Sequence, residues 1–77
     1  MNDMELSEFV RFFITRLLER SKETIEESGR EKDDAFQAGR RMAYYEVMDI
    51  LKSELEVRDA DLKELGLDID LEQMFFS

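Results

Sequence analysis

Arg40, Arg41, Tyr44 and Tyr45 form the cluster in this sequence whose residue types and spacing are best suited to chemistry. Each arginine precedes a tyrosine by four residues, so on a helix guanidinium groups and phenol rings lie on neighbouring turns and can stack as cation–π pairs. Arg40, Arg41 and Tyr44 are therefore a candidate patch for a small anion or a partner protein. The alternative is that both arginines pair with acidic residues of a neighbouring helix.

A second cluster, Asp68, Asp70 and Glu72, alternates in the manner of the first ligands of a calcium loop. Gln73 stands where such a loop needs glycine, and the printed sequence ends four residues later. We expect aspartate here to cap a short C-terminal helix. No metal site and no cofactor are predicted.

Cysteine and histidine are absent, which excludes disulfides, thiolate zinc sites and imidazole ligands. The Glu-x-x-His element of di-iron helical bundles is excluded for the same reason. The serines lie in no recognisable nucleophile motif. The sequence therefore predicts that the protein is not an enzyme.

The net charge of -9 is concentrated towards the C-terminus. Residues 1–45 hold 10 acidic and 8 basic residues, whereas residues 46–77 hold 10 acidic and 3 basic residues. A negative field repels phosphate backbones, so direct nucleic-acid binding is not expected. A basic protein partner is better suited, including one whose nucleic-acid-binding surface the chain would occupy as an acidic decoy.

Apolar residues at three- and four-residue steps predict a first helix over about residues 3–28, ended by Ser28 and Gly29. Asn2 is a candidate cap for its start. The most apolar stretch, residues 9–18, contains Arg11 and Arg16 and is shorter than the roughly 20 residues of a membrane span. The first residues are acidic, unlike a secretory signal, so we expect a cytoplasmic protein without a membrane segment.

A second helix is predicted over about residues 31–57, starting at Glu31 or at Asp34, which is a candidate cap. Its apolar residues occupy more than one side, which requires more than one side to be buried. One side carries a stripe of apolar and small residues: Phe36, Gly39, Ala43, Val47, Ile50 and Val57. The small residues Ala35, Gly39 and Ala43 predict a tight helix crossing, with a ligand cleft at Gly39 as the alternative.

The remaining residues predict two short helical segments, Ala60 to Leu65 capped by Asp59 and closed by Gly66, then about Ile69 to Phe75 behind Asp68 or Asp70. The expected organisation is a helical hairpin over residues 1–58 followed by an acidic tail over residues 59–77. The fold class is all-α.

A hairpin of two helices shields only the stripe where the helices touch, so this pattern predicts association. We expect two hairpins to form a homodimeric four-helix bundle, in preference to a monomer closed by its own tail, whose short segments would cover little area. The predicted function is an interaction module, either an adaptor or a regulator; a ligand- or metal-binding bundle is the further alternative. Candidate interface residues are Phe9, Phe13, Leu17, Ala35, Gly39, Met42, Ala43 and Tyr45.

Overall fold

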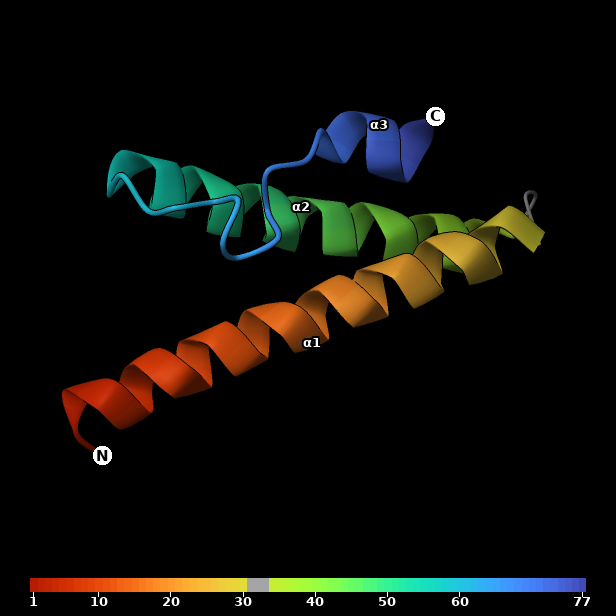
Figure 1. Ribbon diagram of the computed structural model, residues 1–77. Helices are drawn as coiled ribbons and strands as arrows, with labels where there is room; N and C mark the ends of the chain where they lie inside the picture. Colours follow the sequence, from red (N-terminus) through yellow and green to blue (C-terminus); the bar gives the residue numbers. More distant parts are fainter. Residues whose placement is uncertain (31–33) are drawn as a thin grey trace.

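A computed structural model describes residues 1–30 and 34–77 of the chain and contains three helices in that part: α1 (Asp3–Arg30), α2 (Ala35–Val57) and α3 (Leu71–Phe76). No strand occurs among these residues. The two long helices run in opposite directions, and α3 lies along α2 on the side away from α1 (Figure 1). This confirms the all-helical fold with two long helices. None of the described helices is long and apolar enough to cross a membrane.

Helix α1 begins at the predicted cap, Asn2, but it does not end at the predicted glycine, Gly29. The Asn2 side chain accepts a hydrogen bond of 2.8 Å from the Glu5 backbone N–H, which satisfies one of the free donors of the first turn. Gly29 lies within α1, which continues to Arg30. The expected stop at Ser28 and Gly29 is wrong because Gly29 keeps a helical backbone instead of the left-handed conformation that ends helices.

Helix α2 begins behind Asp34, whose side chain accepts a hydrogen bond of 2.9 Å from the Phe36 N–H. The alternative start at Glu31 lies outside the described residues. At the other end, Asp59 adopts a positive φ of 55° and turns the chain back along α2. Aspartate is one of the few residues other than glycine that adopts this conformation readily.

The segment after α2 forms turns over residues 62–66 instead of the expected short helix. Asp61, not Asp59, provides the cap, accepting a hydrogen bond of 3.2 Å from the Glu64 N–H. The helical turn stops because Gly66 has a φ of 76°, which glycine adopts without a Cβ clash. The last helix, α3, is capped by Asp70, which accepts a hydrogen bond from the Gln73 N–H.

The tail contributes most of the buried core, contrary to the small role expected from its short segments. Among the described residues the buried apolar side chains are Ile14, Met48, Leu67, Leu71 and Phe75, of which the last three belong to the tail. Burying a large apolar side chain stabilises the fold by roughly 1.5–3 kcal/mol, so a few well-placed tail residues compensate for the short length of their segments. The tail therefore closes one side of the hairpin.

The two long helices approach each other closely only along the carboxyl-terminal half of α1. Three small polar residues, Ser21, Thr24 and Ser28, are buried there. The hydroxyls of Ser21 and Ser28 donate to the backbone carbonyls of Leu17 and Ile25, at 2.8 Å and 3.0 Å. Small side chains whose polar groups are satisfied allow close helix packing. Towards its amino-terminal end α1 diverges from α2 (Figure 1).

Candidate interaction surfaces

Arg40 holds α1 and α2 together at their closest approach. Its guanidinium donates to the Glu27 carboxylate at 2.7 Å, to the Gln37 side-chain oxygen at 3.1 Å and to the Thr24 hydroxyl at 3.4 Å. This is the alternative considered for the arginine pair, in which an arginine pairs with an acid of the neighbouring helix. Arg40 is consequently half-buried, and part of its guanidinium is already engaged within the chain.

Arg41 joins all three helices. Its guanidinium donates to the Ser28 hydroxyl at 3.4 Å and lies over the Phe76 ring, 5.8 Å from the ring centroid. Tyr45 contacts the same ring at a centroid distance of 4.9 Å and also meets Phe75 at 5.7 Å. The aromatic partner of Arg41 is thus a tail residue that the local spacing of arginine and tyrosine does not indicate.

The stripe on α2 is open to solvent in this structure. We call it the α2 stripe, and its large members Phe36, Ile50 and Val57 are 70%, 63% and 79% exposed. Gly39 and Ala43 are exposed as well, and a Cβ added at Gly39 would meet nothing within 4 Å. The tight crossing expected at Ala35, Gly39 and Ala43 is therefore not made within this chain. The small residues at the actual crossing belong to α1.

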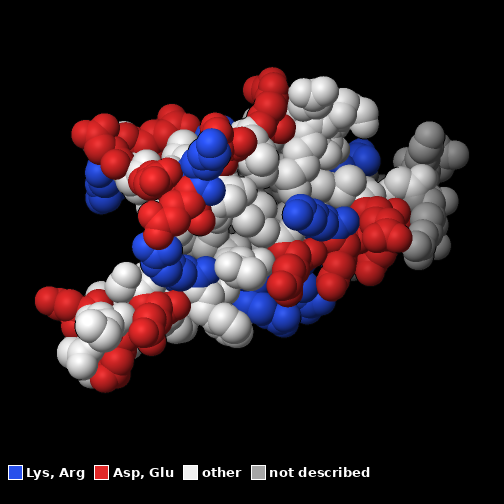
Figure 2. Space-filling view, viewed as in Figure 1, with Lys and Arg blue, Asp and Glu red and all other residues white. Residues whose placement is uncertain are grey.

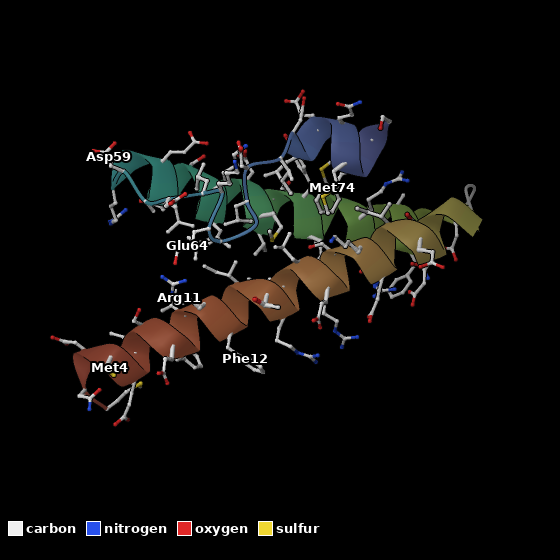
Figure 3. The ribbon with its side chains drawn as sticks, in the orientation of Figure 1. Met4, Arg11, Phe12, Asp59, Glu64 and Met74 are labelled. Atoms are coloured by element: carbon white, nitrogen blue, oxygen red, sulfur yellow. The ribbon has the colours of Figure 1, made fainter. Side chains whose placement is uncertain are left out.

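The amino-terminal end of α1 is also exposed and apolar. Phe9 and Phe13 stack on each other with centroids 5.9 Å apart, yet each remains at least half exposed. Phe12 points away from α2, as Figure 3 shows. Arg11 reaches the other way and forms an ion pair of 2.6 Å with Glu64 of the tail (Figure 3).

The α2 stripe lies on the side of the hairpin opposite to the tail. Successive residues of a helix are rotated by about 100°. On α2, Tyr45 and Lys52 contact the tail, Lys52 through a hydrogen bond of 2.6 Å to the Ile69 carbonyl, while Arg40 contacts α1. Continuing round the helix beyond Arg40, away from Tyr45, the next residues belong to the α2 stripe.

The aromatic residues of α1 occupy the same side of the hairpin. Leu18 faces the tail, since its Cδ1 would lie 3.5 Å from a Cβ at Gly66, and Thr24 faces α2. Phe9 and Phe13 lie beyond Thr24 on the helical wheel, away from Leu18. The α2 stripe together with Phe9 and Phe13 is called the open face below.

An open groove of about 440 Å³ lies between α2 and the tail, on the covered side of the hairpin. Its lining includes four carboxylates and two tail-contacting residues of α2: Asp49, Glu56, Asp70, Glu72, Tyr45 and Lys52. Desolvation raises the pKa of the Tyr45 phenol, and the negative charges of Glu72, Asp49 and Asp70 raise it further. Among the described residues, no group of three or more acidic side chains is arranged to hold a metal ion.

The residues predicted to form an interface are thus divided between two environments. Phe9, Phe13, Ala35, Gly39, Met42 and Ala43 are exposed, whereas Leu17 and Tyr45 are half-buried and pack against the core of the chain itself. Tyr44, from the candidate anion patch, is half-buried against the same core. Sequence reasoning missed the buried hydroxyls of Ser21, Thr24 and Ser28. These residues follow Leu17 at steps of three and four, so they share its helix face. That spacing of small residues on the first helix is the sequence signal for the close contact.

Comparison of the chain with models of protein families, with curated proteins and with solved structures found no match.

Proposed function

We propose that this protein is a helical protein–protein interaction module, an adaptor or regulator without catalytic activity, that acts by pairing its open face with another helical surface. The supporting observation is the exposure of large apolar side chains from both long helices on one side of the hairpin. In the proposed assembly a second hairpin covers this side and produces a homodimeric four-helix bundle.

The energy available from covering the open face is large for a chain of 77 residues. Each large apolar side chain that becomes buried contributes roughly 1.5–3 kcal/mol. The whole unfolding free energy of a native domain is about 5–15 kcal/mol. Several exposed residues of the open face therefore represent stabilisation comparable with that of the fold, and association is the direct way to gain it. Contiguous apolar patches on soluble proteins commonly mark interaction sites.

The acidic-decoy alternative needs a continuous acidic stripe. Figure 2 shows acidic and basic side chains interspersed over the visible face, with carboxylates both near the tail and near the amino-terminal end of α1. The groove between α2 and the tail is acidic, but the basic Lys52 also belongs to its lining and donates to the Ile69 carbonyl. The open face is accordingly the better basis for a function.

Light scattering behind size exclusion, over a wide range of protein concentration, tests this proposal. We expect a dimer whose mass falls to that of the monomer in the variant Ile50→Glu, which places a charge in the α2 stripe. Thr15→Glu is the matched control, since Thr15 is exposed on the same hairpin but lies outside the open face. It should leave the mass unchanged.

Binding of the apolar dye ANS to the wild-type protein completes the test. A monomer that binds ANS has an open face left free for a different protein, which contradicts the homodimer and retains the interaction module. A monomer that binds no ANS has no accessible apolar face and contradicts the proposed function altogether.

A further inference from the structure

We infer that the α2 stripe is covered by the α2 stripe of a second copy of this chain, with the two α2 helices antiparallel about a twofold axis beside residues 46 and 47. This inference rests on the proposed function and adds to it the contacting helix, its orientation and its register. It follows from the order of apolar, small and charged residues along the exposed side of α2.

The apolar residues of the α2 stripe are complementary in size when the helix is paired with its own reverse. Phe36 then lies level with the partner's Val57, and Ala43 lies level with the partner's Ile50. Both pairs are centred between residues 46 and 47, so one register aligns them together. A parallel pair would instead place Phe36 on Phe36 and Ala43 on Ala43, leaving bulky and small layers unmatched.

Of the charges beside the α2 stripe, the pair Arg40 and Glu54 favours the same arrangement, whereas Glu46 lies beside its own copy at the axis. In the register set by the apolar pairs, the partner's Glu54 lies level with Gly39, one residue from Arg40, so an antiparallel pair brings the two opposite charges to adjacent positions. The offset along the helix axis between Arg40 and the partner's Glu54 is one residue rise of about 1.5 Å. A parallel pair would place arginine beside arginine and glutamate beside glutamate. Arg40 already donates to Glu27, Gln37 and Thr24, and Glu54 already pairs with Arg58 at 2.6 Å. The contact between copies uses the remaining N–H donors of the guanidinium, which has five.

The space around the α2 stripe permits a second helix to approach. Nothing lies within 4 Å of a Cβ added at Gly39, and Ala43 is exposed. The tail occupies the opposite side of α2, where Tyr45 meets Phe75 and Phe76. A second copy can therefore dock on the α2 stripe without displacing any element of the first.

Single cysteines test the register directly, because the natural chain contains none. Val47→Cys places two thiols across the twofold axis, and we expect it to form a disulfide-linked dimer under mild oxidation. Phe36→Cys alone should not link to itself, whereas an equimolar mixture of Phe36→Cys with Val57→Cys should give the mixed dimer. Thr15→Cys, which is exposed and outside the open face, is the matched control, and Val47→Cys should link at least about tenfold faster.

Each alternative result has a separate meaning. Self-linking of Phe36→Cys as fast as that of Val47→Cys would show parallel helices and overturn the register. A wild-type dimer in which none of the α2-stripe cysteines links would overturn the contacting surface while leaving the proposed interaction module standing. A wild-type monomer that binds ANS would overturn the second copy as the occupant but not the proposed function. The substituted positions are exposed, and circular dichroism of each variant verifies that the helices are retained.

Discussion

In the carboxyl-terminal half of α1, Ser21, Thr24 and Ser28 are buried, whereas in the amino-terminal half Phe9, Phe12 and Phe13 are 54%, 67% and 50% exposed. Hydrophobicity alone would assign the two halves the reverse roles. The difference arises because α2 packs closely on the first set and diverges from the second (Figure 1). Small side chains permit the close approach, and the hydroxyls of Ser21 and Ser28 are satisfied by carbonyls of their own helix.

The apolar side chains of the molecule are therefore covered in one part of the hairpin and exposed in the other. The closed part contains the buried hydroxyls, the arginine contacts and the tail residues of the core. The open part displays aromatic residues beside the α2 stripe. The predictions below test this division by pairing each change in the closed part with a matched change in the open or exposed part.

The largest expected effect is on the core residue Phe75, compared with Phe12. Phe75 is 2% exposed, so Phe75→Ala should lower the free energy of unfolding by about 3–5 kcal/mol. Phe12→Ala removes the same atoms from an exposed site and should change it by less than about 0.5 kcal/mol. Urea unfolding followed by circular dichroism measures both. An equally large loss for Phe12→Ala would mean that the aromatic end of α1 is buried in solution.

A smaller effect is expected from adding bulk at the helix crossing. Ser21→Val places an extra branch where the helices are in close contact, and it should cost about 1–3 kcal/mol through overpacking. Ser7→Val makes the same change at an exposed position of α1, with the same change in helix propensity. The midpoints of thermal unfolding should therefore separate the two variants. Equal midpoints would contradict a tight crossing at Ser21.

The ion pairs that α1 makes with the other elements should contribute less. Arg40–Glu27, at 2.7 Å, joins α1 to α2, and Arg11–Glu64, at 2.6 Å, joins it to the tail. Double-mutant cycles with glutamine should give under about 1 kcal/mol for each pair, with the larger value for the less exposed Arg40. Both values should decrease with added salt, because exposed charges are screened. A coupling for Arg11–Glu64 that exceeds the other would contradict the weaker attachment of the amino-terminal end.

The smallest effect concerns the alkaline stability of the contact between α2 and the tail. The pKa of Tyr45 is raised above its ordinary value of 10.0 by desolvation and then by Glu72, Asp49 and Asp70. The unfolded chain therefore loses this proton first, so the stability contributed by the neutral phenol is intact below pH 10 and is lost progressively as the pH rises above it.

Absorbance titration of the Tyr44→Phe variant, in which Tyr45 is the remaining tyrosine, should show a midpoint above 10.0. Adding Glu72→Gln should move that midpoint down, since it removes one of the negative charges. Above pH 10, the free energy of unfolding of the Tyr45→Phe variant should decrease less with rising pH than that of the wild-type protein. A midpoint at or below 10.0 in the Tyr44→Phe variant would contradict the raised pKa.

The sequence predicted the helix caps better than the helix ends. The cap at Asn2 was predicted, and Asp34 and Asp70 were each one of two candidates, because a capping side chain bonds to backbone groups two or three residues away. The same reasoning failed at Gly29, since a glycine stops a helix only when it adopts the left-handed conformation, and residue type alone does not determine that. It failed again at Ala60 to Leu65, which form turns capped by Asp61 instead of a helix capped by Asp59, although Gly66 ends the segment as predicted.

The sequence by itself determined that the chain is helical, acidic and richer in apolar helix faces than one hairpin can cover. Only the tertiary structure decided which faces are covered. Arg41 stacks on Phe76, a residue 35 positions away, and Leu67, Leu71 and Phe75 complete the core. Helical periodicity shows which residues share a face, but it does not show which of several apolar segments packs against that face. That choice depends on the path of the tail after Asp59 and on the close packing that Ser21, Thr24 and Ser28 allow.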